Sequence, residues 1–147
     1  MKKAICILIG IIVGIIVLAA IICVVVFSAL NKTKNADYYD LGSDQISSVK
    51  AVLGVRNINR VSTSNNNGII TKLYEYRSNA STEDIEQYIA YLTENEGFIL
   101  TSLNNNQQVY AKESNDKGKL LLLDITNNGF GFTLTIKKGE GTLTITY

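Results

Sequence analysis

The chain has 147 residues, with 14 Lys and Arg against 13 Asp and Glu and a formal net charge of +1. A charge so close to zero does not indicate a nucleic-acid partner. Histidine, tryptophan and proline are absent, and the two cysteines, Cys6 and Cys23, lie in one N-terminal apolar run. The rest of the chain therefore cannot use Ser-His-Asp or Cys-His catalysis, a disulfide or the usual zinc sites. We expect no cofactor and no metal.

The apolar run extends from residue 4 to residue 30 without a charged side chain. A helix of that length reaches roughly 40 Å, which exceeds the hydrocarbon core of a bilayer. It also exceeds the apolar region of a cleavable signal peptide, about 7–15 residues. The segment Val26-Phe27-Ser28 before Ala29 leaves cleavage open as an alternative. We predict an uncleaved transmembrane helix over residues 4–30, with the lipid bilayer as partner.

Basic residues on either side of this run set the expected orientation. Lys2 and Lys3 precede it, whereas Lys32 and Lys34 follow it, so the bias is slight. Because cytoplasmic flanks carry the excess of Lys and Arg, residues 1–3 are expected inside the cell. The sequence thus predicts a single-pass protein of the cell membrane whose C-terminal domain lies outside the cytoplasm.

Cys23 raises the alternative of a lipid attachment site. Such a cysteine needs a small residue before it and a polar segment after it. Here Ile22 precedes it, and Val24, Val25 and Val26 follow. We interpret Cys23 as part of the membrane helix.

The sequence GIIVG places Gly10 and Gly14 one helical turn apart in the run. Two glycines at that spacing let two membrane helices approach closely, so they are candidates for packing in a homodimer. Small residues are also common in membrane helices, and chance explains the pattern more readily.

Residues 31–44 are polar and predict a tether, followed by an extracytoplasmic domain over residues 45–147. Tyr38 and Tyr39 lie in this segment. They either anchor at the lipid headgroups or begin the fold, and we favour the second because aromatic belts lie nearer the span.

The outer domain begins with SDQISSVKAVLGV, whose apolar spacing predicts a short helix ended by Gly54 and capped by Ser43 or Asp44. The same letters also alternate as a strand would, and that alternative stays open. Asn67-Gly68 then predicts a hairpin between two strands. STEDIEQYIAYLTENEG predicts the main helix, over residues 82–96, capped by Ser81 and carrying one apolar stripe.

The remainder predicts five strands, over residues 98–103, 107–113, 119–126, 130–137 and 142–147. No long crossover separates them, so they must pair antiparallel. The run LLLLDI is apolar on both faces, which favours a central strand covered on both sides. The expected fold class is α+β: a meandering antiparallel β-sheet with one main helix packed on one face and a second short helix.

Asp124 is the one carboxylate of interest, because it follows four leucines in the strand expected to be central. It is either buried, with a raised pKa, or exposed at the strand's end. An unpaired buried Asp is rare, so we favour the second. No catalytic residue is predicted.

Three segments, YYDLGSDQISSVKAVLGVRNI, YIAYLTENEGF and GKLLLLDI, carry a wider resemblance. The chain resembles small uncharacterised envelope proteins of Gram-positive bacteria that have an N-terminal anchor and one outer domain. The resemblance implies no activity and assigns no functional residue. We expect a non-enzymatic binding or assembly module whose partner is a protein or a cell-wall polymer. The alternative is a subunit of a membrane complex that dimerises or docks through its transmembrane helix.

Overall fold

The computed structural model describes residues 15–23 and 36–143. The chain divides into two compact units, residues 1–35 and residues 36–147. In the first unit, residues 15–23 form a helix with exposed side chains. Among the described residues, none of the helices has both the length and the apolar character needed to cross a membrane. The described residues include only part of the expected transmembrane span and neither Gly10 nor Gly14. The transmembrane helix therefore stays a prediction.

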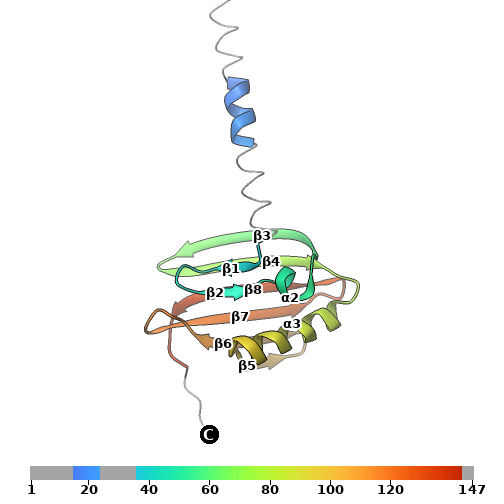
Figure 1. Cartoon of the computed structure of the whole chain (residues 1–147), viewed down its shortest axis with the longest axis vertical. Helices are drawn as coiled ribbons and strands as arrows, with labels where there is room; N and C mark the ends of the chain where they lie inside the picture. The colour runs from blue at the N-terminus through green and yellow to red at the C-terminus, as the bar shows by residue number, and fades with distance from the viewer. Residues whose placement is uncertain (1–14, 24–35, 144–147) are drawn as a thin grey trace, which may run out of the picture. The chain divides into compact units, whose positions relative to one another are not determined.

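The second unit is α+β, as predicted, and Figure 1 shows its elements. The strands are β1 (Tyr38–Asp40), β2 (Gln45–Ser47), β3 (Asn57–Asn66), β4 (Ile69–Arg77), β5 (Ile99–Asn104), β6 (Gln107–Glu113), β7 (Lys119–Asn127) and β8 (Gly131–Glu140). The helices are α2 (Val49–Leu53) and α3 (Ser81–Glu96). The predicted main helix and second short helix are therefore both present.

The main sheet has six antiparallel strands in the order β3-β4-β8-β7-β6-β5. Strands β5 to β8 form the predicted meander, and the β3–β4 hairpin joins it through β4 and β8. Because β4 and β5 lie far apart in this order, α3 must cross the sheet between them. Helix α3 therefore covers one face, which the small β1–β2 sheet and α2 also cover (Figure 1).

The core lies between the sheet and this cover. Period-two alternation points Phe132, Leu134 and Ile136 of β8 inward, and all three are fully buried. The apolar stripe of α3 packs against them. Tyr39 is 3% exposed and belongs to the same core, so this tyrosine does begin the fold. The compact unit thus begins within the range expected for the tether.

The segment predicted as one short helix is divided between two elements. Its first residues form β2, and α2 begins only after Ser48, whose Oγ accepts a hydrogen bond from Ala51 N at 3.1 Å. The predicted cap at Ser43 or Asp44 is therefore wrong, whereas Gly54 ends the helix as expected. Both alternatives held in part, since strand and helix follow each other.

The predicted cap of α3 is also wrong. Ala80 occupies the N-cap position and makes no side-chain cap hydrogen bond. Ser81 Oγ instead donates to Asn127 Oδ1 at 3.1 Å, which ties the helix start to the end of β7. Gly97 ends the helix in the left-handed conformation, as predicted.

The last predicted strand differs from the structure as well. Strand β8 continues to Glu140, because Lys138 still pairs with β4 and Glu140 with β7, so no turn forms at the sequence KGEG. Residues 141–143 lie outside any strand, and residues 144–147 lie outside the described part of the chain.

Strand β7 is central, as predicted, but it is not covered on both faces. Leu121, Leu123 and Ile125 are buried under the cover. Leu120 and Leu122 point to the opposite face and are half-buried. In the described part of the unit, β1, β2, α2 and α3 all pack on the first face. We call the second face the open face.

Candidate functional site

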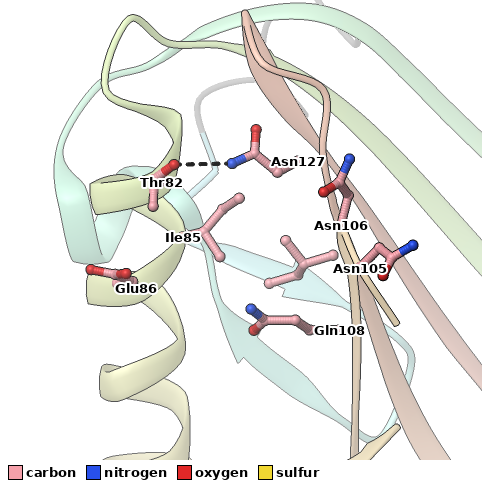
Figure 2. A pocket seen from close by; sticks show the side chains of 8 residues that line it. Thr82, Ile85, Glu86, Asn105, Asn106, Gln108 and Asn127 are labelled. Atoms are coloured by element: carbon pink, nitrogen blue, oxygen red, sulfur yellow. Dashed lines mark hydrogen bonds between the residues drawn. The ribbon is translucent and has the colours of Figure 1, made fainter. Parts of the chain in front are cut away.

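The amide pocket is a hollow of about 190 Å³ between the first turns of α3, the β5–β6 turn and the end of β7 (Figure 2). It is named for the carboxamide side chains that dominate its wall. Its lining consists of Thr82, Ile85, Glu86, Asn105, Asn106, Gln108, Ile125 and Asn127.

The β5–β6 turn is held in place by its local sequence and by β7. Asn105 has φ +28°, close to the left-handed region that asparagine tolerates better than most residues. The backbone N–H of Asn127 donates to Asn106 O at 2.9 Å. The turn is therefore fixed against the end of β7, and the pocket wall is preformed.

The side chain of Asn127 is held in the pocket wall by hydrogen bonds. Its Oδ1 accepts hydrogen bonds from Ser81 Oγ at 3.1 Å and from Gly129 N at 2.9 Å. Its Nδ2 donates to Thr82 Oγ1 at 3.1 Å, the dashed line in Figure 2. These bonds occupy the amide of Asn127 and fix α3 against β7.

Other polar side chains of the pocket have donors or acceptors without a hydrogen-bond partner in the described part of the chain. Glu86, Asn105 and Asn106 are exposed, and their side chains make no hydrogen bond within the described residues. Gln108 Oε1 accepts from Tyr110 OH at 2.8 Å, which leaves the Gln108 amide nitrogen free to donate. Figure 2 shows that amide pointing from β6 toward α3.

Apolar side chains form the deeper wall. Ile85 is 5% exposed and Ile125 is 1% exposed. A carboxamide both donates and accepts, so the wall suits ligand groups that do the same, such as hydroxyls and amides. The wall is thus mainly polar, with a small apolar area formed by Ile85 and Ile125.

Asp124 does not belong to this pocket. It lies on the open face, half-buried, where its carboxylate accepts from Gln107 Nε2 at 2.7 Å and from Thr126 Oγ1 at 3.5 Å. The most buried carboxylates are Asp44 and Asp84, at 2% and 4% exposure, and sequence reasoning singled out neither as buried.

Asp84 pairs with Arg56, which donates from Nε and Nη2 at 2.9 and 2.8 Å. Ser78 Oγ donates to the same carboxylate at 2.6 Å. The hydrogen bonds from Arg56 hold the pKa of the Asp84 carboxyl below its usual value, against the effect of burial. This ion pair holds the start of α3 against the segment before β3, so its role is structural.

Asp44 pairs with Lys138, a buried residue on the covered face of β8. The distance from Lys138 Nζ to Asp44 Oδ2 is 2.7 Å, and the distance to Asp116 Oδ2 is 2.8 Å. Lys138 has the same parity as Phe132, Leu134 and Ile136, so strand alternation alone would have placed it inside. That signal was present in the sequence.

Ser43 Oγ lies 2.7 Å from Lys138 Nζ, as a serine nucleophile would lie from a lysine base. Burial lowers the pKa of the Lys138 ammonium, but the hydrogen bonds to Asp116 and Asp44 outweigh it and hold that pKa above its ordinary value. A lysine that stays protonated cannot accept the serine proton. The cluster therefore joins the β1–β2 and β6–β7 connections to β8 without forming a catalytic dyad.

Within residues 15–23 and 36–143, no three His, Cys, Asp or Glu side chains are grouped so as to hold a metal ion. Comparison of the chain with known protein families, curated proteins and solved structures finds no match.

Proposed function

We propose that the chain is a single-pass, membrane-anchored extracytoplasmic binding module without catalytic activity, and that the amide pocket binds its ligand. The observation that carries the proposal is the set of uncommitted donors and acceptors on Asn105, Asn106 and Gln108 beside the apolar wall. These groups can donate to and accept from a bound ligand, because no hydrogen bond within the described residues occupies them.

Binding, rather than catalysis, fits the ionisable groups of the pocket. Glu86 is the one ionisable side chain in its lining. Acid–base chemistry on a ligand generally needs an acid and a base whose environments shift their pKa values apart. A single exposed carboxylate among amides provides a contact for the ligand, not such a pair.

The anchor in this proposal is the apolar run over residues 4–30, with residues 1–3 in the cytoplasm. Its support is the uninterrupted length of the run. Cysteine labelling in intact cells tests the orientation. In a chain with Cys6 and Cys23 changed to alanine, Ser64→Cys is expected to react with a membrane-impermeant maleimide. Lys3→Cys is expected to react only after permeabilisation, and the reverse pattern would contradict the orientation.

Ligand binding is tested with the full chain in phosphocholine nanodiscs, mixed with purified peptidoglycan, wall polymers, neutral oligosaccharides and uncharged peptides. We expect one of these classes to bind, and Asn106→Ala and Gln108→Ala each to weaken that binding at least tenfold. Asn66→Ala is the matched control, because Asn66 is an exposed amide at the end of β3, outside the pocket. Binding that is equal in all three variants, or absent for every class, would overturn the proposal.

A further inference from the structure

A second hollow lies beside the amide pocket, across the β7–β8 turn. It has a volume of about 390 Å³, and we call it the turn basin. Its lining consists of Asn59, Glu75, Tyr76, Arg77, Asn128, Phe130, Gly131 and Thr133. Asn127 lines the amide pocket and the next residue, Asn128, lines the turn basin. The turn therefore lies between the amide pocket, on the covered face, and the turn basin, whose Glu75 and Thr133 lie on the open face.

Phe130 is the outstanding feature of the turn basin. Its side chain is 92% exposed, more than any other large apolar residue in the described part of the chain. Water around a whole phenyl ring is unfavourable, and nothing in the fold requires a phenylalanine there. An apolar face of a ligand in this hollow could pack against the exposed ring.

The turn that carries Phe130 is held by hydrogen bonds on both sides. Ser78 N donates to Phe130 O at 3.3 Å, and Asn128 N donates to Gly131 O at 2.9 Å. A Cβ on Gly131 would lie 1.9 Å from Tyr76 O, so only glycine permits this approach of β8 to β4. The backbone that carries the ring is thus ordered by hydrogen bonds.

Polar groups surround this ring. Asn128 Nδ2 donates to Thr133 Oγ1 at 2.9 Å, which leaves Asn128 Oδ1 as an acceptor. Arg77 is exposed and makes no ion pair within the described residues. The turn basin, like the amide pocket, is lined mainly by polar side chains, and it adds the exposed ring of Phe130. A sugar ring matches it, because its C–H face is apolar and its hydroxyls both donate and accept.

We infer that the amide pocket and the turn basin are two subsites for one uncharged oligosaccharide, which crosses the turn from Asn127 to Phe130. The inference rests on the proposed function and names its ligand class. Two neighbouring hollows of like chemistry suit a polymer of like units. Glu75 is paired with Arg60 at 3.5 Å, which leaves Glu86 in one subsite and Arg77 in the other. These two charges cancel, so an uncharged chain fits better than a polyanion.

Isothermal titration calorimetry on the full chain in phosphocholine nanodiscs tests the inference. The probes are N-acetylglucosamine, cello- and malto-oligosaccharides of one to six units. We expect the best hexamer to bind at least tenfold more tightly than its monomer. Phe130→Ala is expected to remove that gain and leave monomer affinity unchanged. Phe130→Tyr is expected to keep the gain.

Tyr38→Ala is the matched control, since Tyr38 is an aromatic residue of β1, 54% exposed, outside both hollows. It is expected to change nothing. Affinity that does not depend on length, or a Phe130→Ala variant equal to the control, would overturn the inference. Failure of every oligosaccharide while an uncharged peptide or a wall polyanion binds at Asn106 would overturn it too, and would leave the proposed function standing. Failure of all ligands would overturn both.

Discussion

At the scale of single residues, the charged side chains of the core stabilise the fold. Lys138 and Asp44 are each about 3% exposed at their side chains, and they join segments that are far apart in the sequence. Neither charge can reach water, so each depends on the other. This dependence gives two direct predictions for stability.

Lys138→Met is expected to lower the free energy of unfolding by about 3–5 kcal/mol, because Asp44 is then left buried without its cation. Urea unfolding followed by circular dichroism measures the change. Lys137→Met is the matched control, since Lys137 is exposed on the open face, and it should stay within about 0.5 kcal/mol of the parent chain. Equal effects of the two variants would contradict the role given to Lys138.

Acid should weaken the same cluster. Burial raises the pKa of the Asp44 carboxyl, but hydrogen bonds from Asn115, Lys138 and Ser114 outweigh it and lower that pKa from 3.8 to about 2. A carboxyl whose folded pKa lies below its unfolded value stabilises the fold above the unfolded pKa. Its contribution, roughly 2 kcal/mol, is therefore lost as the pH falls from 3.8 to about 2.

Urea unfolding at several pH values measures how the free energy of unfolding depends on pH. Asp44→Asn should remove the corresponding part of the pH dependence. A variant whose stability falls with pH as steeply as that of the parent chain would show that other carboxyls account for the effect.

At the scale of elements, sequence patterns predicted correctly those features that depend on residues close together in the chain. The stripe of α3, its end at Gly97 and the hairpin at Asn67-Gly68 all follow from residues a few positions apart. The start of α2 was mispredicted because residues 45–47 pair with β1 as strand β2, although its cap at Ser48 is local. The cap of α3 was mispredicted because a tertiary bond decides it. Ser81 turns to Asn127, forty-six positions along the chain, instead of capping its own helix.

Gly131 tests the close approach of β8 to β4. Gly131→Ala is expected to lower the free energy of unfolding by about 2 kcal/mol or more, because φ is +154° and the added Cβ meets Tyr76 O. Gly139→Ala, in the same strand, is the control, since its Cβ would lie 3.4 Å from the nearest atom, in the Ile69 side chain. Thermal unfolding of both variants measures the difference. A Gly139→Ala variant as unstable as Gly131→Ala would contradict this explanation.

At the scale of the whole molecule, the candidate site was the hardest part to predict. The connections near residues 104–106 and 127–129 were expected from the gaps between the predicted strands, and each joins neighbouring strands of the sheet. That Asn106 and Asn127 meet follows from the order of the strands and the crossing of α3, and neither is encoded in a short segment. Lys138, by contrast, was accessible to simple strand alternation.

The anchor also belongs to this scale. Cys23→Ala is expected to leave the chain in the membrane fraction, and metabolic labelling with palmitate or a glycerolipid precursor is expected to be absent. The physical reason is that Cys23 lies inside an apolar run that we expect to span the membrane by itself. Loss of the variant from membranes on cell fractionation would show that a lipid, and not the run itself, holds the chain there.

Binding of a ligand in the amide pocket can be observed directly at the pocket's own amides. The most direct measurement is a nitrogen-15 NMR titration of the full chain in phosphocholine nanodiscs, selectively labelled at Asn and Gln, with the tightest ligand among the envelope polymers, oligosaccharides and peptides above. If the pocket binds this ligand, the side-chain amide signals of Asn105, Asn106 and Gln108 will shift with added ligand, while that of Asn66 stays in place. Signals of the pocket amides that do not move while the ligand binds would contradict binding in the pocket.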